Sequence, residues 1–176
     1  PGDFIPFAEQ TGFMREITHW VVERGARFSR TLADAGLDLA VSVNVSAPDI
    51  QNPEFSREVL ELLRRASVDP KRLCLEITES GVVSESDAAI RNLRAISRIG
   101  VRLSVDDFGT GYATLKQLQQ LPVHELKIDR SFVSGLHRNR GNLTIVRSTI
   151  ELGKQLGLKV VAEGVEPVEE LRCLAR

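Results

Sequence analysis

The stretch S-V-D-D-F-G-T-G-Y, residues 104–112, places two adjacent carboxylates directly after small and apolar residues. Asp106 and Asp107 stand at the end of a predicted strand, and glycines at 109 and 111 then turn the chain toward the next helix. Two like charges in a poorly hydrated place repel each other, and a bound cation removes that repulsion. Oxygen ligands select hard metals such as magnesium or manganese. The pair alone is equally compatible with a solvated helix cap, so the other strand ends decide between the two interpretations.

Five segments with strand periodicity alternate with helical segments along the chain. Strands are predicted over 38–46, 72–78, 101–106, 124–129 and 158–164. After an irregular opening at 1–12, helices are predicted over 13–35, from 53, from Ser84 to 99, around 113–120, over 142–156 and from Pro167. Short connections between alternating helices and strands imply right-handed crossovers and a parallel sheet. No linker or low-complexity tract interrupts the pattern, so we expect a single domain over 1–176.

The first long helix, 13–35, carries apolar residues at helical spacing. We expect its core face to contain Ile17, Val21, Phe28 and Leu32, with Trp20 beside them. The next helix is expected to begin after Asn52 and Pro53, because asparagine caps helices and proline suits the first turn.

The composition is that of an ordinary globular protein. Of the 176 residues, 42% are hydrophobic and 27% are charged, and the net charge of −1 gives no whole-chain attraction to polymeric nucleic acid or to an anionic membrane. The sequence shows neither an apolar run long enough to span a bilayer nor a signal-peptide pattern at its start. Cys74 and Cys173 have no C-x-x-C partner, so we expect both to be reduced residues of a cytoplasmic domain.

Strand parity brings one polar side chain from each strand to a common face. These residues, each at or near the end of its strand, are Asn44, Glu76, Asp106, Lys127 and Glu163. In a barrel of parallel strands they would all point into one mouth at the carboxyl end, where barrel enzymes build their sites. Carboxylate and amide oxygens make a hard-cation site, and a pair of such ions suits phosphodiester hydrolysis. Lys127 adds a positive charge that can orient the attacking water.

Five motifs stand in order along the chain: V-N-V-S (43–46), L-E-I-T-E-S (75–80), D-D-F-G-T-G-Y (106–112), L-K-I-D-R-S-F-V (126–133) and V-V-A-E-G-V-E (160–166). Together they closely resemble the EAL family of bacterial cyclic di-GMP phosphodiesterases. The opening F-I-P-F-A-E-Q-T-G-F is also similar to that family. The resemblance implies an α/β fold, a TIM-like (β/α) barrel that is incomplete here, with about five parallel strands. It also implies hydrolysis of cyclic di-GMP to linear pGpG with two Mg²⁺ or Mn²⁺ ions.

The resemblance further implies a role for each matching residue. The metal ligands would be Asn44, Glu76, Asp106 and Asp107. Lys127 would orient the nucleophilic water with support from Asp129, and Glu163 would be the metal-site glutamate. Glu166 would lie on the substrate side, and Glu79 would hold the loop 108–114 in its working shape.

The chain departs from the family at both ends. The Glu-Ala-Leu motif that names the family is absent, and so is the Q-G-Y-x-F-x-x-P stretch. We therefore expect strands three to seven of the family barrel, without strands one, two and eight, and without one metal-ligating glutamate and a phosphate-binding arginine. This chain alone is expected to be inactive or nearly so, and to form a homodimer through exposed strand edges. A longer parent protein would carry sensor or cyclase modules, and its tethering to a membrane stays open.

Two alternatives remain open. A degenerate EAL domain would act as a cyclic di-GMP receptor without cleaving the nucleotide, although such members usually lose the acids or the lysine that this chain retains. A one-metal barrel lyase also uses strand-end carboxylates and a lysine, but the adjacent aspartates and the family motifs count against it.

Overall fold

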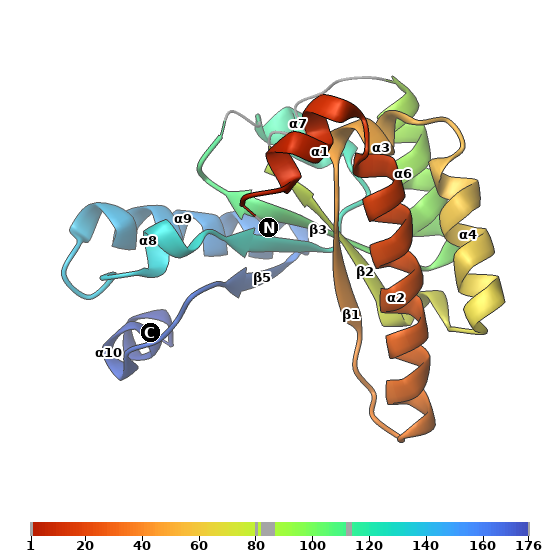
Figure 1. Cartoon of the computed structure of the whole chain (residues 1–176). Helices are drawn as coiled ribbons and strands as arrows, with labels where there is room; N and C mark the ends of the chain where they lie inside the picture. The colour runs from red at the N-terminus through yellow and green to blue at the C-terminus, as the bar shows by residue number, and fades with distance from the viewer. Residues whose placement is uncertain (1, 80, 82–86, 112–113, 176) are drawn as a thin grey trace. The chain divides into compact units, whose positions relative to one another are not determined.

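The computed structural model describes residues 2–79, 81, 87–111 and 114–175 (Figure 1). The helix start expected at Ser84 lies outside these residues. The backbone falls into two compact units: unit 1 comprises 1–77 and 84–103, and unit 2 comprises 78–83 and 104–176. The prediction that the whole chain acts as a single domain stays a prediction.

Five parallel strands form one sheet in the order β1-β2-β3-β4-β5. They are β1 (Val41–Val45), β2 (Leu73–Thr78), β3 (Arg102–Phe108), β4 (Glu125–Ile128) and β5 (Lys159–Ala162). The strand order follows the chain order, which is the pattern produced by successive helical crossovers. The predicted α/β class with about five parallel strands is therefore confirmed.

The helices also follow the predicted alternation. Unit 1 contains α1 (Ile5–Thr11), α2 (Met14–Asp34), α3 (Ala47–Gln51), α4 (Phe55–Ala66), the 3₁₀ turn η1 (Pro70–Arg72) and α6 (Asp87–Ile99). Unit 2 contains α7 (Leu115–Gln120), α8 (Arg130–Val133), α9 (Arg140–Leu156) and α10 (Val168–Leu174). Within the described ranges, no helix has the length and apolar character needed to cross a membrane.

The opening of the chain is helical, so the predicted irregular segment 1–12 is wrong over α1. Pro6 lies in the first turn of this helix, where its missing N–H costs nothing, and Gly12 closes the helix in a left-handed conformation at φ 74°. The two residues that suggested a break thus mark the start and the end of a short helix.

Helix α2 packs on β1 through its small residues rather than through the predicted apolar stripe. Its buried positions are Thr18, Val22, Gly25, Ala26 and Ser29. A Cβ atom on Gly25 would lie 2.6 Å from a methyl group of Val43, so the glycine permits a close approach of helix and strand. Trp20 and Phe28, both expected in the core, are 58% and 56% exposed. Arg24 lies over the Trp20 ring at 5.6 Å, a cation–π contact on the outer face.

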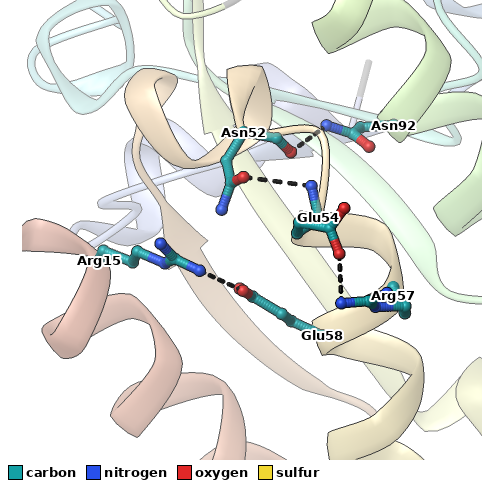
Figure 2. A network of polar contacts seen from close by, with 6 residues as sticks. All are labelled: Arg15, Asn52, Glu54, Arg57, Glu58 and Asn92. Carbon is teal, nitrogen blue, oxygen red and sulfur yellow. Dashed lines mark hydrogen bonds and ion pairs between the residues drawn. The ribbon is translucent and has the colours of Figure 1, made fainter.

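The short helix α3 follows β1 and was not predicted. Asn52 ends α3 instead of capping α4, although its side chain accepts a hydrogen bond from the amide of Glu54 at 3.1 Å. Figure 2 shows that Asn92, from α6, donates to the carbonyl of Asn52, at 2.6 Å. In the same view Arg15 of α2 pairs with Glu58 of α4 at 2.5 Å. Polar contacts therefore join α2, α3, α4 and α6 around the connection that follows β1.

Unit 2 has its own apolar core between α8, α9 and the strands β4 and β5. Ile128, Val133, Leu136 and Val146 are at most 1% exposed and form its centre. Helix α9 ends at Gly157, as predicted, in a left-handed conformation at φ 69°. A Cβ atom on Gly153 would lie 2.2 Å from a methyl group of Val160, so α9 lies directly on β5. This packing supports the strand ends at which the polar residues gather.

Candidate metal and catalytic site

Three carboxylates of unit 2 meet at the carboxyl ends of β3 and β5. Asp106 and Asp107 belong to the end of β3, and Glu163 directly follows β5. One oxygen from each side chain lies within 4.8 Å of the other two, and all three residues are half-buried. Carboxylate oxygens gathered this closely are the donor set of a hard divalent cation. The cluster therefore fits Mg²⁺, Mn²⁺ or Ca²⁺.

Lys127 contacts two of these acids from the strand that lies between them. Its ammonium Nζ is 3.2 Å from Asp106 Oδ1 and 2.6 Å from Glu163 Oε1. Strand β4 pairs with β3 on one side and with β5 on the other, so the lysine can reach an acid on each neighbour. Lys127 is only 9% exposed, and a buried ammonium needs such partners because an unpaired buried charge is costly. Its position at the cluster is the result of strand parity.

The pKa values of Asp107 and Asp129 are shifted in opposite directions. Burial, followed by the charge of Asp106, raises the pKa of Asp107, and the Asp129 charge and hydrogen bond contribute in the same direction. The hydrogen bond from the Ser131 side chain lowers the pKa of Asp129, which also caps α8 by accepting from the Ser131 amide at 2.9 Å. Without a metal, Asp107 therefore binds a proton more readily than Asp129 does. A cation bound to Asp107 would favour its ionised form.

The backbone at Asp107 is left-handed, with φ 54°. A residue other than glycine adopts this conformation at a cost, and such strain persists where surrounding contacts determine it. Here the Asp107 amide donates to the Asp106 side chain at 3.0 Å, and the Asp107 carbonyl accepts from Thr110 Oγ1 at 2.8 Å. The bend turns two successive carboxylates toward the same region, which an extended strand would send to opposite faces.

Glu79 holds the glycine turn that follows the aspartates. Its carboxylate is 3% exposed and accepts hydrogen bonds from the amides of Gly109 at 2.9 Å and Gly111 at 3.0 Å. A side chain at Gly111 would meet this carboxylate at 3.1 Å, and one at Gly109 would meet the Phe132 ring at the same distance. Residues 112 and 113 of the predicted loop 108–114 lie outside the described part of the chain. The geometry supports the predicted loop-holding role over 109–111.

Asn44 and Glu76 belong to unit 1 and lie side by side within it. They are register partners in the parallel β1–β2 pair, with Asn44 exposed and Glu76 7% exposed. The same parity that brings the acids of unit 2 together therefore pairs these two oxygen donors. Their convergence with the cluster of unit 2 stays a prediction.

Three further residues matter here that sequence reasoning missed. Arg130 pairs with Glu166 at 2.9 Å, and both side chains are well exposed. Gly164 has φ 67°, and a Cβ atom there would lie 2.4 Å from Arg130 Cγ, so this glycine lets the chain after Glu163 pass close to Arg130. Glu170 is a buried acid in α10. No sequence pattern distinguishes Glu170 from the neighbouring exposed acid Glu169.

Comparisons with known proteins give a consistent result over the whole chain. The family model described as EAL domain matches residues 1–176. MucR of Pseudomonas aeruginosa, a bifunctional diguanylate cyclase/cyclic di-GMP phosphodiesterase, is 41% identical over 177 residues, which cover 100% of this chain and 26% of MucR. The chain thus spans about a quarter of that relative.

Solved structures agree with the sequence matches. The PaMucR phosphodiesterase in complex with c-di-GMP is 41% identical, with a TM-score of 0.95 over 100% of this chain and 72% of the solved one. The Klebsiella pneumoniae BlrP1 calcium/c-di-GMP complex is 28% identical, with a TM-score of 0.78 over 90% of this chain and 41% of that one.

Proposed function

The chain belongs to the EAL domain family, and we propose that it forms the core of a phosphodiesterase site that hydrolyses cyclic di-GMP to linear pGpG. One observation carries the proposal: Lys127 lies between the carboxylates of Asp106 and Glu163. A lysine ammonium that two carboxylates hold at the ends of the strands can stabilise the negative charge that develops on a phosphate during the reaction. The receptor alternative is not favoured, because the acids and the lysine are present.

The proposed cofactors are two Mg²⁺ or Mn²⁺ ions. Asp106, Asp107 and Glu163 would supply carboxylate oxygens, which already lie within 4.8 Å of one another. Asn44 and Glu76 are proposed as further ligands on the strength of strand parity. When bound, such ions lower the pKa of coordinated water and offset the charge of the phosphate.

The remaining tasks fall to side chains of unit 2. Lys127 orients the attacking water with the ammonium that Asp106 and Glu163 hold in place. Asp129 is proposed to support this arrangement from the start of α8, where it accepts a hydrogen bond from the Ser131 amide. Glu166 is proposed to face the substrate from the connection after β5, and Glu79 to keep the glycine turn in shape.

We also propose a context for the chain. Because it spans about a quarter of MucR, we infer that residues 1–176 act as one domain of a longer cytoplasmic signalling protein. That protein would carry sensor or cyclase modules and would work as a homodimer. Polymeric nucleic acid is not a proposed partner, since the net charge of −1 offers no general attraction to it.

The test is turnover of cyclic di-GMP by the longer protein that contains this chain, with chromatography of the products. We expect pGpG to accumulate with Mg²⁺ or Mn²⁺ and not with a chelator. Asp106→Asn should abolish turnover because it removes a charge from the cluster, whereas Glu151→Gln, an exposed change on α9, should not. Turnover that resists chelation would contradict the metal assignment. Tight binding without turnover in the unaltered protein would favour the receptor function instead.

A further inference from the structure

Glu170 is a buried carboxylate that lies outside the site cluster. It is 2% exposed and occupies the third position of α10. Its Oε1 accepts a hydrogen bond from the amide of Gly135 at 2.7 Å, and its Oε2 accepts one from the amide of Glu166 at 3.3 Å. A buried carboxylate is retained only where hydrogen bonds offset the loss of water. Charge-assisted hydrogen bonds to backbone amides are among the stronger ones.

The two amides belong to two different connections of unit 2. Gly135 follows α8, in the connection that leads away from Lys127 and β4. Glu166 lies in the connection that leads away from β5 and Glu163. Glu170 therefore joins the segment after the lysine to the segment after its partner acid. Lys127 and Glu163 themselves are 2.6 Å apart.

Other contacts also join these parts of unit 2: the Glu163 amide donates to the Ile128 carbonyl at 3.1 Å, and Val165 packs against the core cluster that contains Val133 and Leu136. Arg130 pairs with Glu166, but the two side chains are 64% and 68% exposed, and exposed ion pairs contribute little. The backbone at Gly164 lies against the Arg130 side chain, which limits how closely the connections approach without holding them together. The contact of Glu170 with Gly135 is a buried, charge-assisted hydrogen bond beyond the ends of the β4–β5 pair, and it resists separation of the two connections there.

Helix capping does not account for this arrangement. An acid in the first turn of α10 stabilises that turn through its own nearby backbone, and the bond to the Glu166 amide serves this purpose. The bond to Gly135, 35 residues earlier in the chain, serves another. Resting on the proposed function, we infer that Glu170 is a positioning residue: the β4–β5 pair places Lys127 beside Glu163, and Glu170 fixes their distance by tying together the connections that follow the two strands.

The test compares Glu170→Ala, Glu170→Gln and the control Glu169→Ala in the longer protein. Glu169 is an exposed acid of the same helix turn. We expect Glu170→Ala to lower kcat about 10- to 100-fold, the scale of a small misplacement of reacting groups, with KM within about twofold. Glu170→Gln keeps one acceptor oxygen for Gly135 and should recover most of this loss. Glu169→Ala should change neither constant.

A second readout does not depend on turnover. Labelling of Lys127 by an amine-reactive ester, followed by peptide mass spectrometry, should rise at least about threefold in Glu170→Ala as the pair opens locally, while labelling of the exposed Lys154 stays unchanged. If the unaltered protein does not hydrolyse cyclic di-GMP, the proposed function fails and the labelling still decides on Glu170. Should Glu170→Ala not fold, Glu170→Asp, which withdraws the carboxylate by one methylene, takes its place. Unchanged kcat and unchanged labelling in a folded variant would overturn the inference.

Discussion

Glu79 and Gly109 are 30 residues apart in the chain, and Glu79 Oε2 accepts a hydrogen bond from the Gly109 amide at 2.9 Å. The same oxygen accepts from Gly111. A buried carboxylate thus supplies the acceptor for two amides of a turn that has no regular secondary structure to pair with. The shape of the turn after Asp107 depends on a side chain from the connection after β2.

Replacing Glu79 should loosen this turn. In Glu79→Ala both amides lose their acceptor, so we expect faster hydrogen exchange at 109–111 and a loss of turnover of about tenfold or more, the scale of a small misplacement of reacting groups. Glu79→Gln retains one acceptor oxygen and should cost less. The control Glu151→Ala, on the exposed side of α9, should affect neither measurement. Equal exchange rates in Glu79→Ala and the unaltered protein would contradict the role.

Lys127→Ala should lower kcat by about two to four powers of ten, the scale of losing one well-placed charge partner. Removing the ammonium also leaves Asp106 and Glu163 without the cation that they now contact. Lys154→Ala, which removes an exposed lysine from α9, is the matched control and should keep the parental rate. A Lys127→Ala protein that hydrolyses cyclic di-GMP at the parental rate would show that the assigned role is wrong.

The stability of the metal-free protein should depend on the protonation of Asp107. Its pKa is raised above 3.8, first by burial and then by the charge of Asp106, so the protonated form is favoured in the folded state. The contribution of protonated Asp107 to the free energy of unfolding is complete below the ordinary pKa of 3.8. It is lost as the pH rises through the raised pKa of the folded state. Thermal unfolding in the presence of a chelator should therefore show Tm falling across this range, and Asp107→Asn should flatten the fall.

Asp129 contributes with the opposite sign. Its pKa is lowered, first by the hydrogen bond from Ser131. The contribution of ionised Asp129 to the free energy of unfolding is therefore present above the ordinary pKa and is lost as the pH falls through the lowered pKa of the folded state.

Added Mn²⁺ should raise Tm more at higher pH, because a ligand carboxylate must release its proton. A Mn²⁺ effect that is the same at every pH, or absent, would contradict the assignment of Asp107 as a ligand.

Gly164→Ala should destabilise the protein for two separable reasons. The residue has φ 67°, which costs a side chain about 1–2 kcal/mol, and the new Cβ would lie 2.4 Å from Arg130 Cγ. Gly157→Ala is the matched control, because Gly157 has φ 69° with no atom within 4 Å of a Cβ. Denaturant unfolding should show that Gly164→Ala loses more free energy of unfolding than Gly157→Ala. This difference between the two variants should shrink when Arg130→Ala is added to both. An undiminished difference in the Arg130→Ala background would exclude a clash with Cγ and Cδ of Arg130.

The chain of residues 1–176, taken alone, is expected to self-associate. Strands β1 and β5 are the two ends of the strand order, and an unpaired strand edge is a template for pairing with another chain. Light scattering should report a dimer or larger species, and the turnover of this chain alone should be absent or nearly so. A stable, fully active monomer would contradict both expectations.

Periodicity predicted the strands well and the buried face of α2 poorly. Alternation along β3, β4 and β5 was sufficient to bring Asp106, Lys127 and Glu163 to one face, because a strand has only two faces. Helix α2 offers several faces of similar polarity, and its large residues suggested the wrong one. Gly25 shows the reason, because α2 approaches β1 so closely that only a small side chain fits at this position. Which face of the helix is buried therefore depends on the strand against which the helix packs.

The sequence by itself determined the order of helices and strands, the family motifs and the strand-end position of each polar residue, since these follow from local periodicity and spacing. Only the tertiary structure decided which contacts those residues make. Lys127 pairs with Glu163, and Glu170 reaches Gly135, across intervals of 36 and 35 residues. No repeat in the chain signals such pairs, because they arise when connections from separate strands are brought together by the packing of the helices between them.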